Sequence, residues 1–125
     1  MPIVAHTRQS FTVDGRRVWI VAASLSYARI DPAEWPARLA DVRQAGCNAV
    51  EVPVPWLLHE PRPGRFDFEG PADLPTFLAE ARSAGLHVIL RIGPYVGEGF
   101  DGGGLPGWLV EVEPPPATGR SRSNA

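Results

Sequence analysis

The stretch WPARLADVRQAGCNAVEVPVPW, residues 35–56, decides the fold. Its first half repeats apolar residues at helical spacing and ends at Gly46: Trp35, Leu39 and Val42. Its second half, residues 48–56, is short, apolar and β-branched, which is typical of a buried strand. Because the prolines at 53 and 55 cannot donate to a ladder, we expect the end of this strand to open into a loop.

The same order of elements recurs further along the chain. An apolar stripe predicts a second helix from about residue 72 to 84, and Gly85 ends it. The segment LHVILRIGPY, residues 86–95, follows as a second apolar strand. An Ala-Gly pair precedes both strands, at 45–46 and at 84–85. Apolar strands that alternate with amphipathic helices indicate parallel strands joined by helical crossovers.

The residues before the first helix predict a hairpin and one more strand. Asp14 and Gly15 form a DG pair between β-rich runs, which is a strong hairpin signal. Together with residues 21–27, the chain then holds three parallel strands, the others being 49–56 and 88–95. A closed (β/α) barrel needs eight strands and roughly 250 residues. We therefore expect an α/β fold that is either a piece of a larger barrel or a small open three-stranded domain.

Composition excludes several classes of function. The chain has 125 residues with 12 basic and 14 acidic side chains, so neither nucleic acid nor a membrane surface is expected as a partner. Its one cysteine, Cys47, allows no internal disulfide and no multi-cysteine zinc site, and we expect no metal and no cofactor. No signal peptide or membrane-spanning segment is visible, so the cytoplasm is the default location. Residues 111–125 carry three adjacent prolines and no apolar period, which predicts a disordered tail.

Two kinds of chemistry can be placed beyond the strand ends. The acidic residues within or after the strands suit glycosidase work, in which a retaining enzyme uses two carboxylates roughly 5 Å apart; they are Glu51, Glu60, Glu98 and Asp101. For any one of them a solvated surface charge is the simpler reading. Gly97, Gly99 and Gly102 spell G-x-G-x-x-G after a strand, which leaves a small nucleotide-binding α/β domain as a remote alternative. The following GGLPGW breaks helices and speaks against it.

Longer motifs resemble those of one enzyme family. The segments SLSYAR, PWLLHEPRPGRFDFEG, LRIGPY and GGGLPGWL, within residues 11–109, look like the N-terminal part of glycoside hydrolase family 35, the β-galactosidases. The resemblance implies the first three βα units of a (β/α)8 TIM barrel after a short hairpin, with residues 1–110 as a partial catalytic domain. It also implies retaining hydrolysis of terminal β-linked galactose or a related β-glycoside.

The resemblance places the catalytic glutamates outside this chain. The family's acid/base glutamate follows strand four in an Asn-Glu pair, and its nucleophile follows strand seven. No Asn-Glu pair occurs in the 125 residues, so we assign no catalytic residue and expect the chain to be inactive alone. The alternative is a sugar-binding or assembly subunit that completes a barrel with another chain. Self-association through the unpaired barrel edge is also expected.

Two residues are carried over as sugar contacts. Tyr27 matches the tyrosine of the family's His-Tyr-x-Arg stretch, although Ser26 stands where the histidine would be. Glu98 is the nearest counterpart of the family glutamate after GPY, although an ungapped alignment puts Gly99 at that position. The family's strand-two tyrosine is replaced by Pro53. These departures leave room for a sugar other than galactose.

Overall fold

The computed structural model describes residues 2–111, which form two compact units. The first unit joins Met1–Pro53 to Phe68–Arg91, and the second joins Val54–Asp67 to the described residues from Ile92 onward. Each unit is built from two separate stretches of sequence, so each depends on contacts between distant parts of the chain. No helix among the described residues is long and apolar enough to cross a membrane.

The first unit begins with a three-stranded antiparallel meander. It consists of β1 (Val4–His6), β2 (Phe11–Val13) and β3 (Arg16–Val18), in that order. Asp14 and Gly15 both take positive φ, 50° and 77°, as a two-residue hairpin turn requires. The predicted hairpin is thus confirmed. The strand β1 was not predicted. It pairs with β2, and the loop between them, residues 7–10, has no glycine or proline turn signal.

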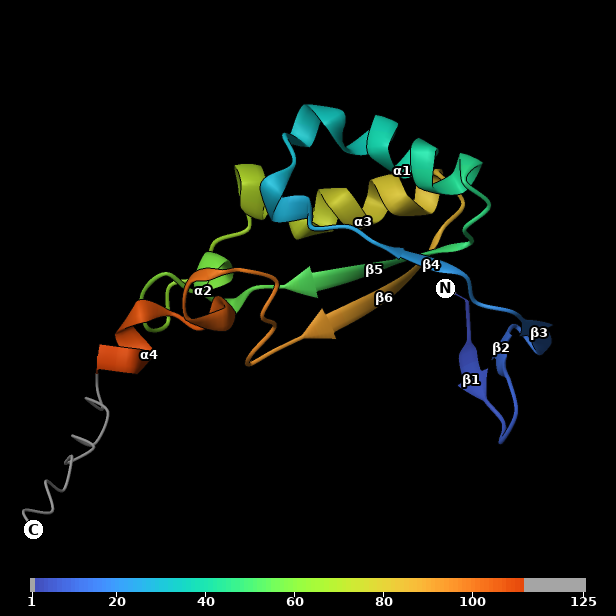
Figure 1. The fold of residues 1–125 in the computed structure, drawn as a ribbon, viewed down its shortest axis with the longest axis horizontal. Helices are drawn as coiled ribbons and strands as arrows, with labels where there is room; N and C mark the ends of the chain where they lie inside the picture. The colour runs from blue at the N-terminus through green and yellow to red at the C-terminus, as the bar shows by residue number, and fades with distance from the viewer. Residues whose placement is uncertain (1, 112–125) are drawn as a thin grey trace, which may run out of the picture. The chain divides into compact units, whose positions relative to one another are not determined.

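A parallel sheet follows, with the strand order β4–β5–β6. Its members are β4 (Ala22–Ser24), β5 (Ala49–Val54) and β6 (His87–Ile92). Ala22 lies opposite Ala49 in the parallel β4–β5 register, and the arrows of β5 and β6 run the same way in Figure 1. The three predicted strands exist, but each is shorter than expected. The first ends at Ser24, so Tyr27 lies in the 3-10 turn η1 (Tyr27–Arg29) rather than in a strand.

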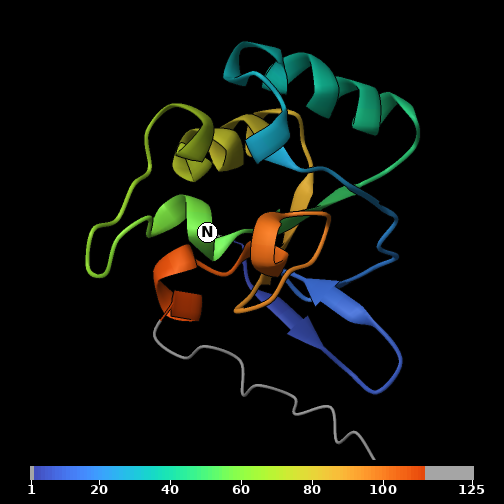
Figure 2. The ribbon, with the colours of Figure 1, turned by 60° about the vertical axis from the view of Figure 1, so that its left-hand side comes forward.

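Two helices lie over one face of this sheet (Figures 1 and 2). They are α1 (Trp35–Gln44), preceded by η2 (Pro32–Glu34), and α3 (Leu74–Ser83), preceded by η3 (Gly70–Ala72). Asp31, at the start of η2, accepts a hydrogen bond from Ala33 N at 2.9 Å. Asp73, which was not singled out in the sequence, caps α3 by accepting from Thr76 N at 2.9 Å. Both predicted helices are therefore confirmed: Asp73 caps α3 directly, whereas Asp31 caps the turn η2 that leads into α1.

The two helices end in the same way. The N–H of Ala45 donates to the carbonyl oxygens of Asp41 and Arg43. The N–H of Ala84 donates in the same way to those of Glu80 and Arg82. The glycines that follow have positive φ, 93° at Gly46 and 75° at Gly85. Next, Cys47 N donates to Val42 O, and Leu86 N donates to Ala81 O. Glycine is needed here because a side chain strains the left-handed backbone that turns the chain into the next strand.

The core of the first unit is an aromatic cluster under the helices. The Tyr27 and Phe77 rings are 5.5 Å apart, and Trp35 meets each of them edge-on. All three side chains are fully buried, as are Leu39, Val50 and Val52. The Trp35 indole also donates to the carbonyls of Tyr27 and Ile30, each at 3.2 Å. The segment after β4 is thereby fixed to the start of α1.

The second unit contains the segments that follow β5 and β6. These are α2 (Trp56–His59), η4 (Asp101–Gly104) and α4 (Gly107–Glu111), and α2 packs against η4. The loop expected at the end of the strand 48–56 thus begins with one helical turn. Trp108 lies in the short helix α4. The expected tail at residues 111–125 lies outside the described residues, apart from Glu111 at the end of α4.

Candidate functional site

An apolar cavity of about 360 Å³ lies in the second unit, at the carboxyl ends of β5 and β6. Its lining comes from the ends of the two strands and the residues after them: Val54, Trp56, Ile92, Gly93 and Pro94. Functional groups in α/β folds gather at this end of the strands, because the loops there are free to vary while the sheet holds them. The cavity is therefore the candidate functional site.

Hydrogen bonds fix the Trp56 wall of this cavity. The Trp56 indole N–H donates to Oε2 of Glu60 at 2.5 Å, and Gly64 N donates to Oε1 at 2.8 Å. The Trp108 indole donates to the carbonyl oxygen of Glu60 at 2.9 Å and meets Trp56 edge-on, with ring centroids 5.7 Å apart. We call Trp56, Glu60 and Trp108 the tryptophan clamp. It orients Trp56 and joins α2 to α4.

The loop after the clamp is closed by a second pair of bonds. Asp67 N donates to the carbonyl of His59, and Nδ1 of the buried His59 ring lies 2.9 Å from the carbonyl oxygen of Asp67. Because a carbonyl can only accept, this nitrogen carries the proton. Within the residues described, the hydrogen bonds of His59 and Glu60 therefore hold the loop of residues 59–67 in place. The HEPRPGRFD motif thus has a structural role.

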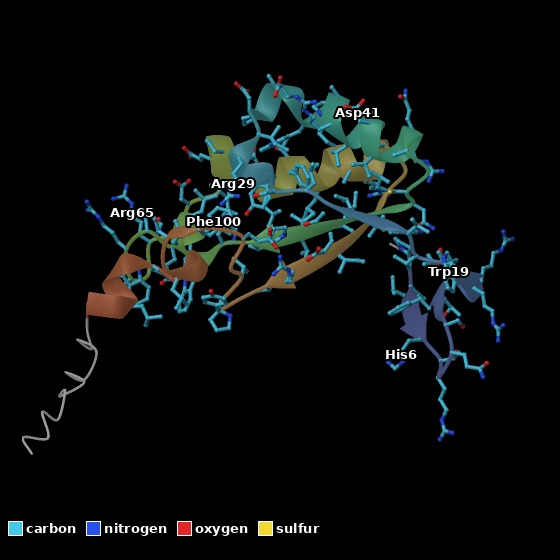
Figure 3. The ribbon with its side chains drawn as sticks, viewed as in Figure 1. His6, Trp19, Arg29, Asp41, Arg65 and Phe100 are labelled. Carbon is cyan, nitrogen blue, oxygen red and sulfur yellow. The ribbon has the colours of Figure 1, made fainter. Side chains whose placement is uncertain are left out.

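The loop after β6 is folded on glycines. Glu98 has a positive φ of 55° between Gly97 and Gly99, whose φ values are 71° and 69°. The carbonyl of Gly103 accepts from both Val96 N and Gly97 N, at 2.9 and 3.0 Å, and closes the loop on itself. Phe100 lies in this loop, as Figure 3 shows. Glu98 is thus presented by a tightly bonded turn in a backbone conformation that a non-glycine residue seldom adopts.

Tyr27, the other predicted sugar contact, lies in the first unit. Its side chain is 0% exposed, between Trp35 and Phe77. Burial raises the pKa of the Tyr27 hydroxyl well above its usual range, so the group stays protonated. The two predicted sugar contacts therefore belong to different units, one buried in an aromatic core and one on a loop.

Glu51, also considered in the sequence, is held by a cation on the neighbouring strand. Its Oε1 accepts from Nε of Arg91 at 2.6 Å, across β5 and β6. The side chains are 29% and 39% exposed, so the pair is only partly shielded from water. Because the Arg91 guanidinium lies at hydrogen-bond distance, Glu51 forms a cross-strand ion pair between β5 and β6.

Metal and nucleotide sites find little support among residues 2–111. That part of the chain contains no group of three or more His, Cys, Asp or Glu side chains arranged to hold a metal ion. The glycines at 97, 99 and 102 lead into a 3-10 turn in which Gly102 and Gly103 are left-handed, and then into the five-residue α4. A dinucleotide site needs a longer helix starting at the glycines.

Sequence reasoning missed the tryptophan clamp. Trp108 and Glu60 are 48 positions apart, and no local spacing rule connects them. The available signal was the chemistry of buried indoles: a partly buried tryptophan N–H generally finds an acceptor.

The family model and the known relatives that match this chain agree on one family. The model of "Glycosyl hydrolases family 35" matches residues 10–125. The chain is 42% identical over 108 residues to a β-galactosidase of Mus musculus and 41% identical over 110 residues to that of Homo sapiens. It is 41% identical over 109 residues to β-galactosidase 10 of Arabidopsis thaliana. These matches cover 86–88% of this chain but only 15–17% of the relatives, so the chain spans about one sixth of their length.

Solved structures agree on the fold. The exo-β-1,4-mannosidase Op5Man5 from Opitutaceae bacterium strain TAV5 matches with a TM-score of 0.57 and 25% identity, over 74% of this chain and 17% of that one. GH5_18 from Bifidobacterium longum subsp. longum matches with a TM-score of 0.56 and 19% identity, over 73% of this chain and 23% of that one. The three-stranded parallel sheet with its covering helices is part of a TIM barrel, as the sequence predicted.

Proposed function

The chain belongs to glycosyl hydrolase family 35, and from this premise we propose that it supplies part of the sugar site of a retaining β-galactosidase without catalysing on its own. The family match over residues 10–125 carries the proposal. The cavity at the carboxyl ends of β5 and β6 supports it, because it offers an apolar wall of the kind that sugar sites use.

We expect the isolated chain to be inactive because of the partners that its carboxylates have. Retaining hydrolysis requires an acid/base and a nucleophile roughly 5 Å apart. Glu51 is bonded to Arg91, and Glu60 to Trp56 and Gly64. The Asn-Glu pair expected from the family resemblance is missing from the sequence. We therefore assign sugar binding to this chain and leave proton transfer and nucleophilic attack to residues that it does not contain.

Glu98 and Tyr27 have different parts in this proposal. Glu98, on the loop after β6, would accept hydrogen bonds from sugar hydroxyls. Tyr27 is fully buried, so we expect it to act from within the core by fixing the segment that follows β4. Glu98→Gln should then weaken sugar binding directly, whereas Tyr27→Phe should act mainly through stability.

The test replaces the matching segment of the Mus musculus β-galactosidase, to which the chain is 42% identical, with residues of this chain. We expect the chimera to hydrolyse a chromogenic β-galactoside and the isolated 125-residue chain not to. In the chimera, Glu98→Gln should lower kcat/KM by about tenfold or more, as the loss of a charged hydrogen-bond partner does. Asp101→Asn in the same loop is the matched control. Hydrolysis by the isolated chain would contradict the proposal.

An assembly role is the second candidate, and the edge of the sheet favours it. β6 is the last strand in the order β4–β5–β6, and its Ile89 and Leu90 are exposed. An unpaired edge with apolar side chains can pair with another chain. We propose that this edge takes either a second copy or a complementing barrel segment.

A further inference from the structure

Tyr95 stands out in the second unit as a large aromatic side chain that is both exposed and firmly supported. It directly follows the cavity-lining Pro94, and 69% of its surface is exposed. Tyrosine rings are enriched at binding surfaces, because an apolar ring and a polar hydroxyl are combined in one side chain. The glycine loop after β6 provides that support.

The ring of Tyr95 lies against two glycines. A methyl group added to Gly103 would stand 1.9 Å from Cε2 and 2.3 Å from Cδ2 of the ring. A methyl group added to Gly97 would stand 3.6 Å from Cε1, on the other edge of the ring. The ring therefore spans the bare backbone of both residues, and any side chain at position 103 would displace it. Since the carbonyl of Gly103 is bonded to Val96 N and Gly97 N, the support itself is fixed.

Charge restricts what such a ring can bind. The loop from residue 93 to 107, GPYVGEGFDGGGLPG, contains Glu98 and Asp101 and no basic residue. A nucleotide or another anion would meet only negative charge there, which opposes its binding. A neutral polyhydroxylated ring suits it better, because the C–H groups of its face can stack on the aromatic ring while its hydroxyls donate to acceptors.

We propose that Tyr95, supported by Gly97 and Gly103, is a stacking platform for the face of a neutral pyranose ring. The ligand class rests on the proposed function, whereas the platform itself rests on the exposure of the ring and on the glycine contacts. The tryptophan clamp holds Trp56 at the cavity that Pro94 helps to line. Aromatic groups on the segments after both β5 and β6 would then recognise the sugar.

The experiment uses the 125-residue chain with labelled tyrosine rings and methyl β-D-galactopyranoside as the probe. The chain has two tyrosines, so the buried Tyr27 is an internal control for Tyr95. We expect the Tyr95 ring signals to shift on titration and the Tyr27 signals to stay in place. Methyl β-D-glucopyranoside and the open-chain polyol sorbitol are titrated in parallel.

Variants separate the platform from its surroundings. Affinities from ligand-observed NMR should fall about fivefold or more for Tyr95→Ala and stay within about twofold for Tyr95→Phe, since the ring supplies the stacking energy. Gly103→Ala keeps the tyrosine but displaces its ring, so it should weaken binding as Tyr95→Ala does. Gly102→Ala is the matched control, because it also lies at positive φ but a methyl group there meets nothing within 4 Å.

The results of the titrations and of the variants support or overturn the Tyr95 platform as follows. Shifts of the Tyr95 ring with either pyranoside, together with weaker binding by Tyr95→Ala and by Gly103→Ala, support the platform. Binding of the glucoside but not the galactoside keeps the platform and contradicts the galactose assignment in the proposed function. No shift with any pyranoside, or equal shifts with sorbitol, overturns the platform. A Tyr95 shift that depends on protein concentration without sugar also overturns it, because a second copy then covers the ring.

Discussion

The buried hydroxyl of Tyr27 links a single residue to the stability of the first unit. Its side chain has no solvent exposure, and burial raises its pKa above the usual value of about 10. The folded chain therefore holds this proton more tightly than the unfolded chain does. The resulting stability is complete below about pH 10 and falls as the pH rises above the unfolded value.

This makes alkaline unfolding a test of Tyr27. In a Tyr95→Phe background Tyr27 is the one tyrosine left, so tyrosinate absorbance reports it alone. We expect no absorbance change until the far-ultraviolet circular dichroism shows unfolding, and then both signals should change together. Tyrosinate that forms while the helices stay intact would contradict the buried position.

Glu60 is the second residue whose role can be measured alone. Its carboxylate accepts from Trp56 and Gly64, so Glu60→Ala removes two bonds to a charged acceptor. We expect a loss of about 1–2 kcal/mol in urea denaturation followed by tryptophan fluorescence, and about half that for Glu60→Gln. Glu34→Ala, which breaks only an exposed pair with Arg38, should change stability by less than about 0.5 kcal/mol. Equal effects of Glu60→Ala and Glu34→Ala would contradict the clamp.

At the level of elements, the start of α3 depends on the charge of Asp73. Hydrogen bonds from the backbone and side chain of Thr76 lower the pKa of this carboxyl. Its contribution to stability is therefore present above the unfolded value of about 3.9 and is lost as the pH falls through the lower folded value.

Thermal unfolding of cap variants tests this dependence. Asp73→Ala should lower the melting temperature at neutral pH, and it should lose less on acidification than the unmodified chain. Asp73→Asn retains a capping oxygen without a charge, so its melting temperature at neutral pH should lie between those of Asp73→Ala and the unmodified chain. The same acid-induced loss in the unmodified chain and in Asp73→Ala would rule out this role for Asp73.

The elements also mark how far sequence reasoning reaches. The helices α1 and α3 could be predicted because their apolar spacing and glycine ends, at Gly46 and Gly85, are local features. The strand β1 could not, because the loop that joins it to its partner β2 has no glycine or proline turn signal. The short α2 could not, because packing against η4, far along the chain, accompanies it. The site divides in the same way. Glu98 was reached through a motif, whereas the support of Tyr95 by Gly103 depends on how the loop closes.

For the whole molecule, we expect the free edge of β6 to govern association. Ile89 and Leu90 are exposed on the last strand of the parallel sheet. We expect the apparent mass from light scattering to rise with concentration, and Leu90→Lys to keep the chain monomeric because charges block edge pairing. Val4→Lys, on the edge strand β1 of the other sheet, is the control. A mass that is constant with concentration, or an equal effect of both variants, would contradict self-association through β6.

The matching ends of α1 and α3 have a consequence for how such a protein can evolve. The backbone pattern from helix to strand is the same at Gly46 and at Gly85. A gene duplication whose breakpoints fall at these glycines would add a whole helix–strand unit and rebuild the same junction on either side. The bonds that close each junction lie within a few residues of it, so a new copy would bring its own junction along. Barrels can then gain or exchange units at sites that are already compatible.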